Sequence, residues 1–267
     1  SSNLALAGGV ALNAVANGRI RHETLFEELY IQPAAGDSGT AVGSAYYVWN
    51  QVLGQPRGPV MAHAYTGPEY DDASIEAAVA AAGVTAERLD DDRLFPHVAE
   101  RIAEGDVVGW FQDGMEFGPR ALGHRSIVAD PRRADMKDVL NARIKHREPF
   151  RPFAPSILAE EVGEWFDQDY PSPFMVLVYG TKPDKRELIP AVNHVDDTGR
   201  VQTVDAGVAP RYHRLIAEFG RRTGVPVLLN TSFNENEPIV MTPAHALETF
   251  LETRMDLLVL GNFLVRR

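Results

Sequence analysis

The sequence contains no cysteine among its 267 residues. This absence excludes disulfides, thiolate metal sites and cysteine nucleophiles, and it agrees with a reducing cytoplasm, where we expect the protein to work. No apolar run approaches the ~20 residues that a helix needs to cross a bilayer. We therefore expect a cytoplasmic protein without a membrane partner.

Positive charge is also scarce, since 26 Lys and Arg face 37 Asp and Glu and give a formal net charge of -11. Such a chain repels nucleic-acid backbones, so we expect no nucleic-acid partner. The cations that are present are unevenly distributed, with nine of them between Arg120 and Arg151. An acidic protein that gathers its positive charge in one segment is predicted to bind a small anion there.

This basic segment interleaves its cations with Gly, Pro and Phe instead of a repeating Glu pattern. Guanidinium groups bind phosphate oxygens in pairs and a lysine adds a compact charge. Arg120, Lys145 and Arg151 are therefore predicted to bind a polyphosphate or an acyl phosphate. Four other cations are predicted to pair with nearby acids on an exposed amphipathic helix that begins at Pro131: Arg132, Arg133, Lys137 and Arg143.

A hydrophobic content of 45% suits a substantial core and more than one domain. The Gly- and Pro-rich connector at residues 54–68 predicts a boundary between residues 1–62 and residues 63–267. In the first unit we expect strands at 3–7 and 28–32, a helix at 10–17 that Gly18 ends, and a closely packed helix at 40–53. Because the chain enters a buried-strand pattern without an initiating Met, we also expect a missing N-terminal region.

The second unit is predicted to be mixed α+β. Its expected helices lie at residues 72–82, 95–104, 211–223 and 244–252. Its expected strands lie at residues 107–112, 156–158, 175–179, 201–204, 225–229, 257–260 and 263–265. Trp110, Trp165 and Met241 are predicted to pack in the core.

Two motifs in the first unit have alternative interpretations. Gly8 and Gly9, between a strand and a helix, form either a simple turn or a place where a nucleotide approaches the backbone. Asp37 either caps a helix or supplies one ligand of a metal whose other ligands come from elsewhere.

The second unit also offers polar side chains at strand ends. Arg200 shares a strand face with Gln202 and binds either a ligand or a cross-strand acid, while His194 is either a ligand or a turn residue. Asn230 and Ser232 follow a buried strand, where short polar side chains either face a ligand cleft or form a turn.

Six motifs, in chain order, resemble the O-carbamoyltransferase family, which includes nodulation-factor enzymes and the tobramycin and cephamycin carbamoyltransferases. They are LAGGVALN at residues 6–13, GDSG at 36–39, GPRALG at 118–123, REPFRPFAP at 147–155, RVQTV at 200–204 and NTSFN at 230–234. The resemblance therefore covers essentially the whole chain.

The resemblance implies an α+β fold in which residues 1–62 form the C-terminal part of an actin/Hsp70-like ATPase-fold (Kae1-like) domain. Residues 63–267 would form a YrdC-like twisted open-sheet domain. It also implies that carbamoyl phosphate and ATP form carbamoyl adenylate with release of pyrophosphate. The carbamoyl group would then pass to a hydroxyl of a small-molecule acceptor such as an antibiotic or sugar.

Site residues follow from the same resemblance. Arg120, Lys145 and Arg151 would be catalytic and, with Arg200, Asn230 and Ser232, would bind carbamoyl phosphate and the phosphates of ATP together with Mg²⁺. Gly8, Gly9 and Asn13 would contact the adenylate, and Asp37 would ligate Fe²⁺. The family's His-x-x-x-His metal motif does not occur in this chain, so a missing N-terminal region of the same enzyme, or another polypeptide, would supply it.

Two other functions fit these residues. One is a threonylcarbamoyl-adenylate synthase-like enzyme that uses threonine and bicarbonate. The other is a nucleotide-binding regulatory module that keeps the anion pocket without chemistry.

Overall fold

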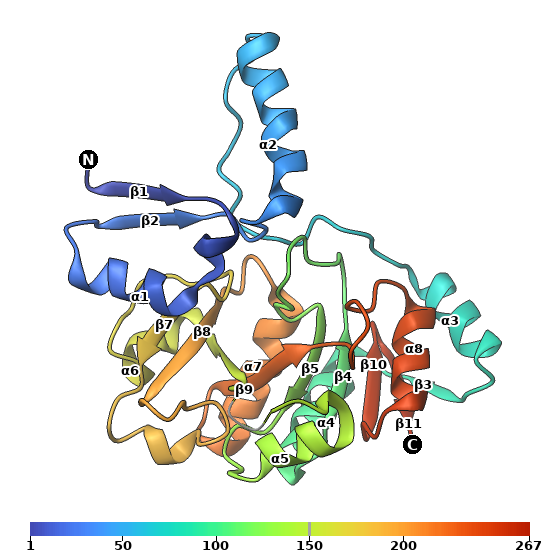
Figure 1. The fold of residues 1–267 in the computed structure, drawn as a ribbon. Helices are drawn as coiled ribbons and strands as arrows, with labels where there is room; N and C mark the ends of the chain where they lie inside the picture. Colours follow the sequence, from blue (N-terminus) through green and yellow to red (C-terminus); the bar gives the residue numbers. More distant parts are fainter. Residues whose placement is uncertain (149–150) are drawn as a thin grey trace.

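The computed structural model describes residues 1–148 and 151–267, which form a mixed α/β structure with two sheets (Figure 1). A small parallel sheet joins β1 (Asn3–Leu6) to β2 (Glu28–Ile31). A nine-stranded mixed sheet has the order β3-β11-β10-β4-β5-β9-β6-β8-β7. Its strands are β3 (Ala86–Arg88), β4 (Val108–Phe111), β5 (Arg125–Ala129), β6 (Ala154–Leu158), β7 (Leu177–Gly180), β8 (Thr198–Val204), β9 (Val227–Ser232), β10 (Leu257–Leu260) and β11 (Phe263–Arg266).

The helices are α1 (Ala14–Glu23), α2 (Thr40–Tyr47), α3 (Asp72–Ala81), α4 (Asp91–Glu104), α5 (Met136–Leu140), α6 (Val162–Trp165), α7 (Pro210–Thr223) and α8 (Pro243–Glu252). The longer ones follow clear sequence signals, as α7 illustrates: it begins with Pro210 in its first turn and ends at Gly224 in the left-handed conformation. Its apolar face packs against α4. The predicted helices and strands of the second unit are confirmed to within a few residues.

Strand β5 was not expected, because it begins with the polar pair Arg125 and Ser126. Arg125 is fully buried, and its guanidinium donates hydrogen bonds to the carbonyl oxygens of Gln112, Asp113 and Pro68. The same group lies 3.6 Å above the ring centroid of Phe111. Since carbonyl oxygens and an aromatic face satisfy the cation, an arginine can begin a central strand.

The prediction that Gly18 ends a helix at residues 10–17 is wrong. Helix α1 starts at Ala14, after the Asn13 side chain accepts the backbone N–H of Ala16 at 3.1 Å, and it continues through Gly18 to Glu23. A Cβ on Gly18 would overlap the carbonyl oxygen of Val178 in β7. This glycine therefore marks a close approach between a helix and a strand, which the sequence alone does not distinguish from a helix end.

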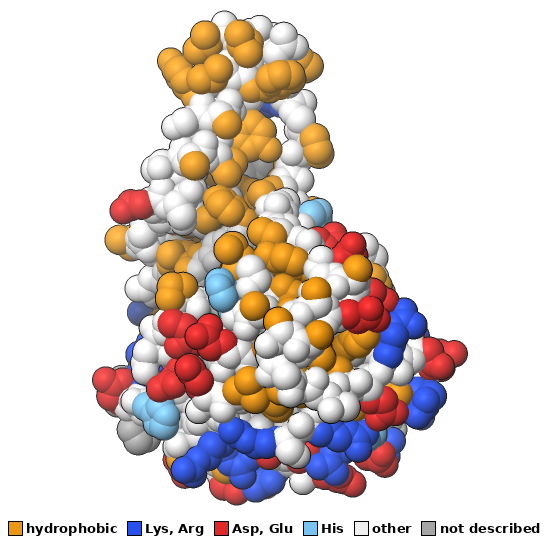
Figure 2. All heavy atoms as spheres, turned by 90° about the vertical axis from the view of Figure 1, so that its right-hand side faces the viewer, with side chains coloured by type: hydrophobic (Ala, Val, Ile, Leu, Met, Phe, Trp, Pro, Cys, Tyr) orange, Lys and Arg blue, Asp and Glu red, His pale blue; other side chains and the backbone are white. Residues whose placement is uncertain are grey.

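Helix α2 was expected to pack closely, and this prediction is also wrong. The helix and the π-helical turn that extends it, η3 (Val48–Val52), project away from both sheets (Figure 1). Figure 2 shows the apolar surface of this projection. Its exposed large side chains are Tyr46, Tyr47, Val48, Trp49, Val52 and Leu53. The boundary between residues 62 and 63 stays a prediction.

A helix was also expected directly after Pro131, but α5 begins only at Met136 and continues into a π-helical turn, η4 (Asn141–Lys145). Two of the cations near it pair with nearby acids as expected, Arg132 with Asp130 at 2.6 Å and Arg133 with Asp135 at 2.7 Å. Arg143 pairs instead with the distant Asp256 at 3.1 Å. Lys137 donates to the carbonyl oxygen of Asn193 at 3.2 Å.

The structure confirms two of the three predicted core side chains. Trp110 and Trp165 are buried, whereas Met241 is 43% exposed and lines a surface hollow beside α8. Within residues 1–148 and 151–267, the helices are all too short or too polar to cross a membrane.

Gly123 gives a test of the packing that shapes the basic segment. Its φ is +102°, and a Cβ there would overlap the ring of Tyr212 in α7, which is fully buried. We expect Gly123→Ala to reduce the free energy of unfolding by about 2 kcal/mol more than Gly83→Ala does. Gly83 is a matched control because it also has positive φ, but a Cβ added to it would have no atom within 4 Å. Chemical denaturation measures the difference. Equal losses in the two variants would show that contact with Tyr212 does not add to the cost of a side chain at Gly123.

Candidate anion-binding site

Four guanidinium groups converge on one cavity of about 390 Å³. Arg120 comes from the loop before β5, Arg147 and Arg151 follow η4, and Arg200 lies in β8. None of the described residues that line the cavity is an aspartate or a glutamate. The cavity is therefore strongly positive and suits an anion with several oxygens.

The arginines are close enough to repel one another. Burial, followed by the charges of Arg120, Arg147 and Arg151, lowers the pKa of Arg200 to about 9. Burial lowers the pKa of Arg120, and burial together with the charge of Arg151 lowers that of Arg147. Arg120, Arg147 and Arg200 are still cationic at neutral pH. An anion between them would remove the repulsion.

Hydrogen bonding supports the same conclusion. The Nε atoms of Arg120, Arg147 and Arg200 are buried and have no acceptor among the described residues. Buried donors in folded proteins are usually paired, so these groups are suited to a ligand's oxygens.

A buried polar network holds the loop that carries Arg120. Gln202 donates to the carbonyl oxygen of Leu122 at 2.7 Å, and Asn230 donates to that of Ala121 at 3.2 Å. Ser156 joins the two side chains, because it donates to Gln202 at 2.6 Å and accepts from Asn230 at 3.0 Å. Asn230, a predicted ligand residue, thus fixes the loop beside the cavity and does not line the cavity.

Lys145 and Ser232 form a separate contact. The ammonium group of Lys145 donates to the carbonyl oxygens of Ser232 and Asn234 at 2.6 Å each and to the Asn234 side chain at 2.8 Å. It ties the end of η4 to the end of β9 and does not line the arginine cavity. Burial, followed by the nearby charge of Arg147, lowers the pKa of Lys145 to about 7.

The remaining predicted site residues lie in the first unit. Asn13 lines the arginine cavity, whereas Gly8 and Gly9 do not. Gly8 has φ +95° and its N–H donates to the carbonyl oxygen of Ala35 at 2.8 Å, so this turn packs against the loop that contains Asp37.

Asp37 is the first residue of the short 3₁₀ turn η2 (Asp37–Gly39), whose N-cap position is Gly36, so Asp37 is not the cap of this turn. In the part of the chain that the structure describes, no group of three or more His, Asp or Glu side chains could hold a metal ion. An iron site at Asp37 would therefore need ligands from outside these residues.

Two polar side chains that line the cavity, Arg147 and His194, are not among the predicted site residues. Arg147 lies in the REPFRPFAP motif and stacks 4.3 Å above the ring centroid of Phe153. His194, for which a ligand role and a turn role were both open, also lines the cavity, and its buried Nε2 has no partner among the described residues. Burial is the main cause that lowers the pKa of His194, and the charges of Arg200 and Lys137 add to it.

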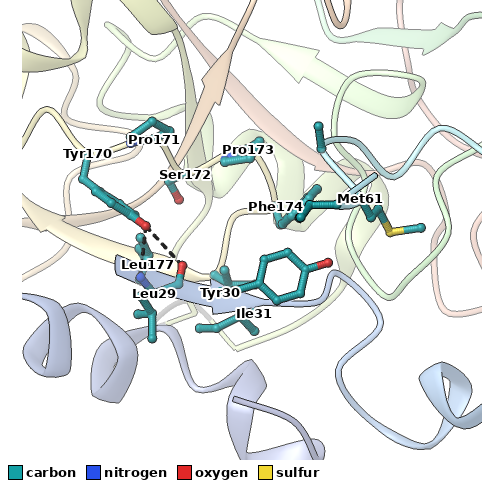
Figure 3. A pocket seen from close by; sticks show the side chains of 13 residues that line it. Leu29, Tyr30, Ile31, Met61, Tyr170, Pro171, Ser172, Pro173, Phe174 and Leu177 are labelled. Carbon is teal, nitrogen blue, oxygen red and sulfur yellow. Dashed lines mark hydrogen bonds between the residues drawn. The ribbon is translucent and has the colours of Figure 1, made fainter. Parts of the chain in front are cut away.

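A second, apolar cavity of about 270 Å³ lies between the two units (Figure 3). Strand β2 forms one side of it, and residues 170–177 with Met61 form the other. The hydroxyl of Tyr170 accepts the N–H of Leu29 at 3.1 Å and donates to its carbonyl oxygen at 3.2 Å, which ties the units together. This cavity lacks charged side chains among its described lining residues and offers no chemistry of its own.

Two family models match most of the chain. The model "Carbamoyltransferase C-terminus" matches residues 99–267, and "Carbamoyltransferase N-terminus" matches residues 1–46. The uncharacterized protein sll1178 of Synechocystis is 47% identical over 99% of this chain and 48% of its own length. The nodulation protein NolNO of Sinorhizobium fredii is 47% identical over 99% of this chain and 40% of its own.

A named enzyme is also similar: the 3'-hydroxymethylcephem-O-carbamoyltransferase of Amycolatopsis lactamdurans is 36% identical over 88% of this chain and 43% of its own length. The chain thus spans less than half the length of each of these three relatives.

Replacing one cavity arginine should affect binding and stability in opposite directions. We expect Arg200→Met to weaken the binding of inorganic pyrophosphate at least about tenfold, because one charged hydrogen-bond donor is lost. Without pyrophosphate, the same variant should unfold at a higher temperature, because a buried charge and its repulsion by the neighbouring arginines are removed. Calorimetry measures both quantities. Arg254→Met, at an exposed arginine, is the control.

The stability gain should also depend on pH. The pKa of Arg200 is lowered from 12.5 to about 9 by folding, so its unfavourable contribution is fully present below about pH 9 and declines as pH rises toward 12.5. The advantage of Arg200→Met over the parent protein should be smaller at pH 10 than at pH 7. An advantage that is equal at both pH values would show that folding does not lower the pKa of Arg200.

Proposed function

Because this chain belongs to the carbamoyltransferase family, we propose that it forms the carbamoyl-activating part of an ATP-dependent O-carbamoyltransferase. The observation that carries this proposal is the cavity with four arginines and no acidic lining residue among those described. Adenylate formation brings two phosphate-bearing reactants together, which requires concentrated positive charge.

The proposed reaction converts carbamoyl phosphate, ATP and water into carbamoyl adenylate, pyrophosphate and phosphate. Phosphorus balance requires the separate phosphate, because the adenylate keeps only the α-phosphorus of ATP and pyrophosphate carries the other two. Loss of phosphate from carbamoyl phosphate leaves carbamate, and a carbamate oxygen then attacks the α-phosphorus and expels pyrophosphate. Water supplies the oxygen that balances the phosphate.

In this proposal Arg120, Arg151 and Arg200 bind phosphate oxygens and stabilise the charge on the departing groups. Lys145 and Ser232 are proposed to contact the substrate from the end of β9. There the ammonium group of Lys145 would donate its hydrogen bonds to oxygens of the ligand in place of the carbonyl oxygens of Ser232 and Asn234. Mg²⁺ bound to ATP would supply further positive charge. Asn230 keeps Arg120 in place through the loop at Ala121.

The proposal assigns residues 63–267 to a YrdC-like domain and residues 1–62 to part of a Kae1-like domain. Gly8, Gly9 and Asn13 would contact the adenylate there. The final acceptor would be a hydroxyl of a small molecule, as the name of the similar cephem enzyme suggests for that enzyme. Asp37 alone does not form an iron site, so we derive no step through iron.

The direct test incubates the purified chain with Mg-ATP and carbamoyl phosphate and measures pyrophosphate together with carbamoyl adenylate by mass spectrometry. We expect both products, and we expect Arg120→Ala to lose at least about 100-fold in rate, since removal of a preorganised donor at a developing charge has an effect of that size. Parallel reactions with threonine and bicarbonate test the threonylcarbamoyl alternative.

The result that would contradict the proposal is a folded chain that binds ATP and forms neither product, also when the N-terminal half of a full-length relative is added. That result would favour a regulatory module that binds nucleotide without chemistry.

A further inference from the structure

The arginine cavity lies where the two units meet. One wall comes from the larger unit and carries Arg120, Arg147 and Arg200, and the other is the segment Leu12–Val15, which contains the N-cap and the first residues of α1. Figure 1 shows α1 beside β7, at the edge of the nine-stranded sheet. The cavity is therefore complete only when α1 is docked.

The beginning of α1 adds positive character to that wall. The first backbone N–H groups of an α-helix have no acceptor within the helix, and the helix dipole is positive at this end. The Asn13 side chain occupies the N–H of Ala16 at 3.1 Å. The preceding N–H groups, of Ala14 and Val15, belong to residues that line the cavity. Helix starts of this kind bind phosphate in many proteins.

A second, independent observation points to a ligand at the same place. Arg200 is largely buried and lines the cavity, and its Nε has no acceptor among the described residues. The Nε2 atom of His194 is in the same situation. Unpartnered polar atoms of the larger unit thus lie at the same cavity as the first backbone N–H groups of α1.

The position of α1 depends on two contacts with the larger unit. The buried Asn17 side chain donates to the carbonyl oxygen of Val176 at 3.0 Å and to that of Ala11 at 2.8 Å. Next to it, the backbone of Gly18 lies directly against Val178, with no room for a side chain. Neither contact uses a charged side chain, so each can be altered without removing a cation, although Val178 pairs with Arg200 in the sheet and also lines the cavity.

We propose that the first turn of α1 and Arg147 complete the phosphate site, so that a phosphoanhydride bound there holds residues 1–62 against the nine-stranded sheet. Four guanidinium groups carry more positive charge than a single phosphate needs, and the cavity has a volume of about 390 Å³. Both observations favour a ligand with two or more linked phosphates. The identification of the phosphoanhydride as part of ATP rests on the proposed function. The existence of a shared site, formed by α1 and the arginines of the larger unit, does not.

Reciprocity follows from this arrangement. If docking of α1 strengthens anion binding, the anion must strengthen docking of α1 by the same factor. Because of this coupling, the inference can be tested by a change at Gly18, which helps to dock α1 and does not line the cavity.

The test compares the affinity of inorganic pyrophosphate for the parent chain, Gly18→Ala and Gly43→Ala by titration calorimetry at low salt. We expect Gly18→Ala to bind pyrophosphate roughly tenfold more weakly, because its Cβ displaces α1 from Val178 and moves the first N–H groups of the helix away from the anion. A tenfold loss of affinity is about the contribution of one hydrogen bond to a charged group. Gly43 is the matched control, since it is also a helical glycine but a Cβ added to it would have no atom within 4 Å. Its variant should bind like the parent.

Hydrogen exchange provides a readout that does not depend on Gly18→Ala. In the parent chain, pyrophosphate should slow exchange of the α1 amides, residues 14–23, and this effect should be lost in Arg147→Met. A folded Gly18→Ala with parental affinity, or pyrophosphate binding without any protection of α1, would overturn the inference. So would the absence of pyrophosphate binding, because the shared site would then not exist.

These outcomes are separate from the proposed chemistry. A chain that binds pyrophosphate and protects α1 but forms no adenylate would refute the proposed function and leave the shared site standing. If the Gly18→Ala variant formed adenylate as well as the parent chain does, the proposed function would stand and the shared site would be refuted.

Discussion

Mutual repulsion between buried guanidinium groups is the constraint that shapes this site. Arg200 lies in a strand, Arg120 in a loop and Arg147 after a π-helical turn, so three different backbones must hold like charges together. Burial is the first cause of the lowered pKa of each of the three groups, and the charges of neighbouring arginines lower the pKa of Arg147 and Arg200 further. Such an arrangement is typical of functional sites, where the fold is less stable than it would be without the charges.

The surrounding structure shows what opposes the repulsion. The loop of Arg120 is fixed at its far end by Gln202 and Asn230, and at its base by the buried carboxylate of Glu116. One oxygen of Glu116 accepts the N–H groups of Leu122 at 2.6 Å and His124 at 2.9 Å. These hydrogen bonds are buried, so breaking one of them would leave an unpaired polar group at a cost in free energy. The network therefore holds the loop in one position.

The sequence predicted the chemistry of the site better than its geometry. Arg132 and Arg133 lie within two or three residues of acids, so their pairing was predictable from local spacing, and the structure confirms it. Arg120 and Arg200 are far apart in the chain, and only the sheet brings them to one cavity. Lys145 carries the same charge, but η4 directs it toward the carbonyl oxygens of β9.

The errors in the fold have a related cause. A glycine within a helical pattern has two meanings, an end or a close contact, and the choice depends on a partner distant in sequence. For Gly18 that partner is Val178, 160 positions later in the chain. Similarly, β5 begins with an arginine because Phe111 and carbonyl oxygens surround it, which no local pattern encodes. Long, periodic elements such as α7 were predictable because their own residues decide them.

The contact between the two units gives these observations a common basis. Gly118, two residues before Arg120, has φ +134°, and a Cβ there would lie 2.9 Å from the carbonyl oxygen of Pro33. The loop of Arg120 therefore packs against the loop that leads to Asp37, while Gly8 is bonded to Ala35 in that same loop. A shift of residues 33–37 cannot leave the Arg120 loop unaffected, because closely packed backbone cannot deform continuously. The two glycine-containing motifs at residues 6–13 and 36–39 and the loop of Arg120 thus belong to one packed contact, so the site is built from segments on both sides of residues 54–68.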